Sequence, residues 1–94
     1  MTTWIDTQDT EKIDAAVAAM RRKAGEGDRA CGGVLDYAGG DEQFALWLRQ
    51  IDIHVGKRLG LSVFDLPDVC WRDYFDDGLS PIEALTAGRA AMDL

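Results

Sequence analysis

The chain has 94 residues, of which 47% are hydrophobic and 29% charged, and this composition is typical of a single soluble globular domain over residues 1–94. Its net charge of −7 argues against direct binding to nucleic acid or to anionic membranes, since phosphate groups attract clusters of Lys and Arg. No apolar run is long enough to span a bilayer and no signal peptide is recognisable, so we expect a cytoplasmic protein. A chain of this size has a small core, to which all its helices must contribute unless a homodimer completes it.

The first helix is predicted over residues 8–24. Apolar side chains recur there at helical spacing, at Ile13, Ala16, Val17, Met20 and Ala24. Acidic residues gather at its start and basic residues at positions 21–23, an arrangement that suits the helix dipole and indicates a solvated helix end. Trp4 precedes the helix and lies outside its apolar face, so we interpret it as a hydrophobic staple, with partner binding as the alternative.

Residues 25–40 are predicted to form a Gly-rich loop that joins the first helix to a helical core over residues 41–94. This segment holds six of the ten glycines of the chain, and glycine loses too much backbone entropy on folding for a stable helix. Within it, residues 34–37 are expected to attach the loop to the core as a short strand or turn. The paired glycines lack the spacing and the following Lys of a nucleotide-binding loop.

The clearest helical pattern of the chain lies at residues 42–59. Its main apolar face consists of Phe44, Trp47, Leu48, Ile51, Val55 and Leu59. Leu46 and Ile53 fall nearly opposite this face, so we expect other helices to pack on two sides. The stripe that should prefer water consists of Ala45, Arg49, Asp52 and Gly56. Asp41 is placed to cap the start of this helix, and Gly60 to end it.

Two short elements are predicted after the central helix. The capping-box spacing of Ser62 and Asp65 predicts a turn at residues 63–65. Pro67 should stop this turn, because proline restricts the residue before it. A helix then follows over residues 69–76. One face of that helix is aromatic, with Trp71, Tyr74 and Phe75.

The strongest helix-start signal is Ser80-Pro81 followed by Glu83, and it predicts a last helix over residues 81–92. Ser occupies the cap, Pro the first helical position and Glu the third. The fold class is therefore mostly α, a small bundle of about four helices over residues 8–24, 42–59, 69–76 and 81–92.

Four motifs occur in order: Phe44-x-x-Trp47-Leu48-x-x-Ile51-Asp52, Gly60-Leu61-Ser62-x-x-Asp65-Leu66-Pro67-Asp68, Trp71-Arg72-Asp73-x-Phe75-Asp76-Asp77-Gly78 and Ser80-Pro81-x-Glu83-Ala84. Over residues 42–90 this order resembles small helical proteins of unknown function that bacteria and bacteriophages encode. The resemblance implies a bacterial or phage setting and no particular activity. Asp outnumbers Glu thirteen to four and Arg outnumbers Lys seven to three, as GC-rich codons favour.

Few residues are candidates for catalysis or metal binding. His54, the only histidine, falls at the edge of the main apolar face, and we interpret it as a boundary residue and not as a general base. Cys70 has no base predicted beside it and is interpreted as a buried free thiol, and no CxxC pair indicates zinc. The acidic residues lack the spacing of a calcium loop. We therefore predict no enzyme activity, no metal and no cofactor.

The candidate partner-binding residues are Asp73, Asp76 and Asp77, together with Trp4. The acids at the end of the helix oppose its dipole, a mild cost that is compatible with a role in binding a basic surface. The leading hypothesis is a non-enzymatic protein-interaction module, encoded by a phage or prophage, that binds a host or phage protein in the host cytoplasm. One alternative is an acidic mimic of nucleic acid that occupies the basic site of a DNA-binding protein. Another is a small enzyme or regulatory subunit.

Overall fold

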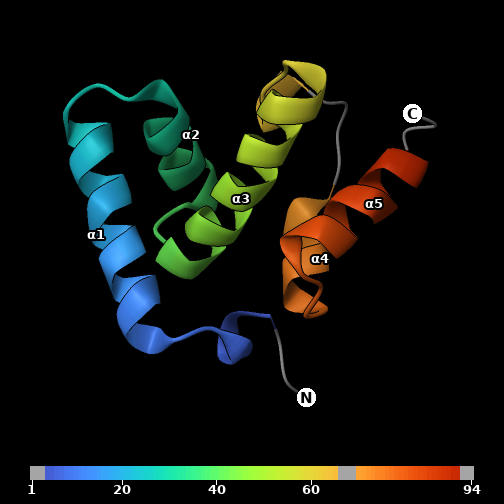
Figure 1. Cartoon of the computed structure of the whole chain (residues 1–94), viewed down its shortest axis with the longest axis horizontal. Helices are drawn as coiled ribbons and strands as arrows, with labels where there is room; N and C mark the ends of the chain where they lie inside the picture. Colours follow the sequence, from blue (N-terminus) through green and yellow to red (C-terminus); the bar gives the residue numbers. More distant parts are fainter. Residues whose placement is uncertain (1–3, 66–69, 92–94) are drawn as a thin grey trace.

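Helix α3 runs through the middle of the molecule, with two helices on each side of it (Figure 1). The computed structural model describes residues 4–65 and 70–91. The α-helices are α1 (Thr10–Gly25), α2 (Arg29–Ala38), α3 (Glu42–Leu59), α4 (Trp71–Asp76) and α5 (Pro81–Ala91). Two 3-10 turns, η1 (Ile5–Thr7) and η2 (Val63–Asp65), complete the elements, and the described residues contain no strand. The expectation of a mostly α fold is confirmed.

Helix α3 begins and ends where the capping residues predict. Asp41 Oδ1 accepts a hydrogen bond from the backbone N–H of Phe44 at 3.0 Å, and Gly60 takes a left-handed conformation with φ of +67°. Helices α1 and α2 contact it from one side, and α4 and α5 from the other, so packing on two sides is also confirmed. The Trp47 indole is fully buried, and its Nε1 donates a hydrogen bond to the carbonyl of Leu79 at 2.9 Å.

The loop predicted for residues 25–40 is wrong for most of its length, because α2 occupies Arg29–Ala38. Asp28 Oδ1 caps this helix by accepting a hydrogen bond from the N–H of Cys31 at 3.1 Å, and Gly39 ends it with φ of +63°. Cys31 and Val34 are buried between α2 and its neighbours. Burial of this face against α1 and α3 offsets the entropy that the glycines lose, which intrinsic propensity does not take into account.

One of the two glycines inside α2 has a packing role. A Cβ atom placed on Gly33 would lie 3.0 Å from the Cε2 atom of Phe64, so the missing side chain lets the Phe64 ring lie close to the helix backbone. A Cβ atom on Gly32 would meet no atom within 4 Å, and nothing in the structure explains that glycine.

The stripe of α3 that was expected to prefer water is largely buried. Ala45 is fully buried and Asp52 is only 6% exposed, whereas Gly56 is exposed as predicted. The reason is that both α2 and η2 pack against α3, and Asp52 accepts hydrogen bonds from Ser62 and Val63. Leu59 was assigned to the apolar face, but it is exposed, since it is the last residue of α3.

The C-terminal helices follow the predicted signals closely. Ser80 Oγ accepts a hydrogen bond from the N–H of Glu83 at 3.1 Å, and Glu83 Oε1 accepts one from the N–H of Ser80 at 3.0 Å, which completes the predicted capping box. Trp71 is buried, and the other two aromatic residues of α4, Tyr74 and Phe75, pack against the core. The predicted stop at Pro67 and the end of the last helix at residue 92 lie outside the described residues. Among the helices that are described, none is both long and apolar enough to cross a bilayer.

Candidate functional site

The three candidate acids lie on α4 and at its end, and all are exposed. They are not equivalent, however. Asp76 accepts a hydrogen bond from Arg72 Nε at 3.1 Å, and Arg72 Nη1 also pairs with Asp41 at 2.8 Å. Asp73 and Asp77 make no side-chain hydrogen bond or ion pair within the described part of the chain. The patch therefore offers two unpaired carboxylates and not three.

Arg72 fastens α4 to the start of α3. Its guanidinium lies 5.1 Å from the centre of the Phe44 ring and 5.4 Å from that of Phe75. The hydrogen bond to Asp41 raises the pKa of Arg72. Burial acts to raise the pKa of Asp41, but the Phe44 N–H and the Arg72 guanidinium outweigh this effect, and the pKa is lowered. The position of Arg72 thus has a structural explanation.

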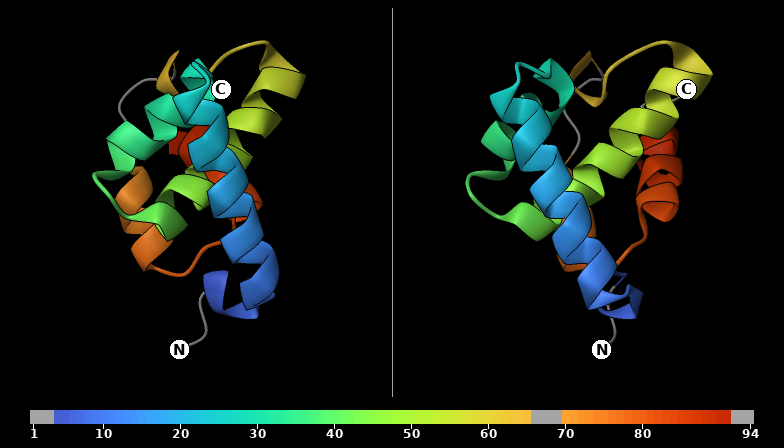
Figure 2. Two further views of the ribbon diagram at one scale, coloured as in Figure 1. Left: turned by 90° about the vertical axis from the view of Figure 1, so that its left-hand side faces the viewer. Right: turned by 60° about the vertical axis from the view of Figure 1, so that its left-hand side comes forward.

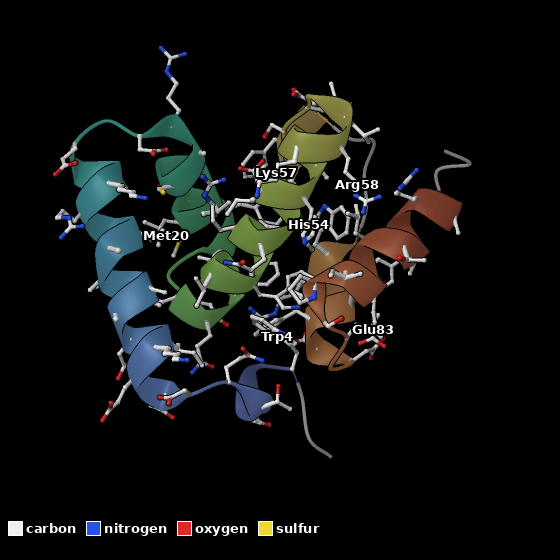
Figure 3. The ribbon with its side chains drawn as sticks, in the orientation of Figure 1. Trp4, Met20, His54, Lys57, Arg58 and Glu83 are labelled. Carbon is white, nitrogen blue, oxygen red and sulfur yellow. The ribbon has the colours of Figure 1, made fainter. Side chains whose placement is uncertain are left out.

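Trp4 is partly buried and packs against the core, as a staple should. Its side chain lies between the middle of α3 and the start of α5 (Figure 3). It lines two small hollows, one with Ile13 and Leu46 and the other with His54 and Pro81. A role of Trp4 in partner binding stays a prediction.

The two candidate nucleophile or base positions are not brought together. His54 is partly exposed and lines a hollow of about 180 Å³ whose other lining residues include no acid. Cys70 was expected to be a buried thiol, but it is exposed at the start of α4, because it precedes the helix and its side chain does not form the cap. The buried free cysteine is Cys31. No group of three or more His, Cys, Asp or Glu side chains in the described ranges could hold a metal ion.

A broader concave surface of the described residues lies elsewhere, between α2, α3 and η2. This groove has a volume of about 610 Å³. Three basic side chains line it: Arg29 at the start of α2, and Arg49 and Lys57 on α3. We call it the basic groove. Sequence reasoning missed it because its basic residues lie far apart in the chain and α2 was taken for a loop.

Asp52 fixes η2, which forms one wall of the basic groove. Its Oδ1 accepts hydrogen bonds from the N–H of Val63 at 2.9 Å and from the hydroxyl of Ser62 at 3.0 Å. Its Oδ2 accepts one from Arg49 Nη1 at 2.7 Å. The carboxylate therefore fixes both η2 and the Arg49 guanidinium against α3.

Exposed apolar side chains gather at η2, and we call Leu61 and Phe64 the apolar wall of the groove. Leu61 is 43% exposed and Phe64 44%, and both line the basic groove. Tyr37 of α2 is 50% exposed, and its ring centre lies 5.8 Å from that of Phe64. Five large apolar side chains of the described residues are exposed, and three of them meet here. A hydrophobic patch beside basic side chains is a common feature of binding surfaces.

The charges of the molecule are separated along its length. Helices α1 and α3 both begin toward one end of the molecule and end toward the other, while α2 runs back between them (Figures 1 and 2). Each of these two helices has an acid in its first turn and two bases in its last, Glu11 with Arg22 and Lys23, and Glu42 with Lys57 and Arg58. The last turns of α1 and α3 therefore bring four basic side chains toward one end of the molecule, where Glu26 and Asp28 also lie.

Comparison of the chain with protein-family models, with curated proteins and with solved structures gave no match in any of the three. The resemblance to small helical proteins of bacteria and phages accordingly stays a prediction. Function has to be argued from the geometry of the chain itself.

Proposed function

We propose that this chain is a non-enzymatic protein-interaction module, of phage or prophage origin, that binds one host or phage protein through the basic groove. The observation that carries the proposal is the meeting of Tyr37, Leu61 and Phe64 beside a concave surface on a helical scaffold. Exposed apolar groups that are held by a rigid fold and bordered by charge supply both affinity and specificity in protein recognition.

The groove has features that make its shape persistent. Asp52 holds η2 through two hydrogen bonds, and the Phe64 ring lies against the backbone of α2 at Gly33. A preformed surface loses little conformational entropy when a partner binds. The same arrangement gives no support to catalysis, because no histidine or cysteine lines the groove and the Ser62 hydroxyl donates its hydrogen bond to Asp52.

The acidic mimic of nucleic acid is the second candidate, and the exposed, unpaired carboxylates of Asp73 and Asp77 favour it. Two observations weigh against it. Arg72 neutralises part of the patch at Asp76, and the last turns of α1 and α3 carry four basic side chains. A mimic of a phosphate backbone needs a regular row of negative charges over an extended surface.

A photo-reactive amino acid placed at position 64 or at position 82 tests the proposal in bacteria that contain the natural partner. Ile82 of α5 is 59% exposed and lies away from the basic groove, so it is a matched control. We expect a discrete cross-linked protein from position 64 and none from position 82. The proposal fails if both positions give the same products.

The two candidate surfaces are then compared with the identified partner. Phe64→Ser should weaken binding at every salt concentration, because apolar contacts are not screened. The Asp73→Asn, Asp77→Asn double variant should bind as the parent does. The opposite pattern, in which the double variant loses binding at low salt and Phe64→Ser keeps it, would favour the acidic mimic.

A further inference from the structure

Three basic side chains converge on the basic groove, and two of them, Arg29 and Lys57, have no carboxylate partner among the described residues. Arg29, Arg49 and Lys57 line it, and the only acid among its lining residues is Asp52. The Asp52 carboxylate already accepts three hydrogen bonds. The lining therefore has three basic side chains and one carboxylate, in a chain whose net charge is −7.

Two acids lie next to groove residues in the sequence, outside the lining of the groove. Asp28 accepts a hydrogen bond from the N–H of Cys31, and Asp65 accepts one from the N–H of Ser62 at 2.9 Å. Both carboxylates keep their negative charge, and the Cys31 N–H lowers the pKa of Asp28, an effect to which the Arg49 guanidinium adds. Neither acid lines the groove, where three bases face one carboxylate.

Arg49 differs from the other two cations because its position is fixed. Its Nη1 donates to Asp52, and a quarter of its side chain stays exposed on the groove side. A guanidinium held in this way keeps N–H groups available in the fork geometry that suits a second carboxylate. Arg29 and Lys57 are exposed and supply longer-range attraction.

We propose that the basic groove takes a short acidic segment of the partner protein, in which a large apolar side chain is flanked by carboxylates. The apolar side chain packs on Leu61 and Phe64, and the carboxylates pair with Arg49, Lys57 and Arg29. This inference rests on the proposed function, and it names the chemistry of the segment that is bound.

A peptide fits these charges better than a nucleic acid does. The cations cover one groove, whereas a nucleic acid strand carries phosphates along its whole length and would meet the acids that dominate the rest of the surface. The apolar wall also needs a complementary side chain between the charges, which a peptide provides at the spacing of its residues.

A selection of random short peptides on the immobilised full-length chain tests the inference. We expect the enriched peptides to combine Asp or Glu with Leu, Ile, Phe or Trp. One enriched peptide is then labelled, and its affinity is measured by fluorescence anisotropy for the parent and for single variants. Single-stranded DNA of similar charge is titrated in parallel.

Adjacent residues on α3 provide a matched pair of variants. Lys57 lines the basic groove, whereas Arg58 does not line it and lies on the side of α3 toward α5 (Figure 3). Lys57→Gln should weaken peptide binding by about two- to fivefold at low salt, and the difference should fade near about 0.5 M salt. Arg58→Gln removes the same charge and should change affinity by less than half as much. Phe64→Ser should weaken binding by about tenfold at both salt concentrations.

Each other outcome overturns a defined part of the inference. Enriched peptides without acids that still lose binding in Phe64→Ser would refute the acidic segment and leave the proposed function standing. Equal losses in the Lys57 and Arg58 variants would show that net charge alone acts, and tighter binding of the DNA would make the groove a phosphate site. A selection that enriches no peptide would refute the groove as a protein-binding surface, and the proposed function with it.

Discussion

Replacing Asp52 by Ala removes the buried carboxylate that joins α3 to η2. The N–H of Val63 then loses its acceptor in a buried position, which costs about 1 to 3 kcal/mol. The pair with Arg49 contributes about 0.5 to 1 kcal/mol more, since that side chain is one quarter exposed. We expect the free energy of unfolding to fall by about 2 to 4 kcal/mol, a large part of the stability of a small domain.

The contrast with the isosteric variant makes the experiment specific. Asp52→Asn keeps an oxygen that can accept from Val63 and Ser62 and loses the ion pair, so it should cost only about 1 kcal/mol. Urea unfolding followed by tryptophan fluorescence measures both variants, with Asp36→Ala on the exposed face of α2 as a control within about 0.5 kcal/mol. A loss below about 1 kcal/mol for Asp52→Ala would show that the hydrogen bonds to η2 do not stabilise the fold.

Three further changes test other parts of the structure. Trp47→Ala should lower the free energy of unfolding by about 3 to 5 kcal/mol in urea, because it empties a fully buried site and removes the hydrogen-bond donor to the Leu79 carbonyl. A loss below about 1 kcal/mol would contradict the burial of Trp47. Gly32→Ala should raise the free energy of unfolding by about 0.5 to 1 kcal/mol, since the added methyl meets no atom within 4 Å. Gly39→Ala should lower it, because Gly39 has a φ of +63°. If both variants shift the melting temperature in the same direction, the assignment of α2 is wrong. The free energy of unfolding should fall as the pH drops below about 4, because three capping carboxylates have lowered pKa values in the folded protein. They stabilise the fold fully above their pKa values in the unfolded chain, and this effect is lost as the pH falls through their pKa values in the folded chain. A melting temperature that is constant from pH 6 to about 3 would refute this. These carboxylates are Asp28, Asp41 and Glu83.

The sequence predicts α3 and the start of α5 well because their signals are local. The cap at Asp41 joins residues three positions apart, and so does the capping box of Ser80 and Glu83. Hydrogen bonds of this range depend on little beyond the residues that form them. The turn at residues 63–65 was predicted for the same reason.

Helix α2 is harder to predict, since its stability comes from contacts that are distant in the sequence. The glycines argue against a helix, but burial of Cys31 and Val34 against α1 and α3 decides the outcome. A signal was nevertheless present. Asp28 has a cap position, and apolar side chains follow at helical spacing before Gly39.

The candidate site shows the same division between local and distant information. The exposure of Asp73 and Asp77 follows from the periodicity of α4, whereas the pairing of Asp76 depends on where the Arg72 side chain lies. The basic groove could not be read from the sequence, because no segment of the chain is rich in basic residues there. It exists only once α2 is packed beside α3.

Folding and binding at this groove depend on the same contacts. Asp52 keeps η2 against α3, and η2 carries Phe64, whose ring lies on the backbone of α2 at Gly33. Loss of the Asp52 hydrogen bonds should therefore displace the apolar wall, because they join η2 to α3, the helix against which η2 chiefly packs. Asp52→Asn separates the two effects: it keeps the hydrogen bonds to η2 and frees Arg49 from its partner. If Arg49 binds a carboxylate of the segment, this variant should be folded, slightly less stable than the parent, and altered in its affinity for acidic peptides. An unaltered affinity would mean that Arg49 serves only the fold, leaving Arg29 and Lys57 as the cations that attract the partner.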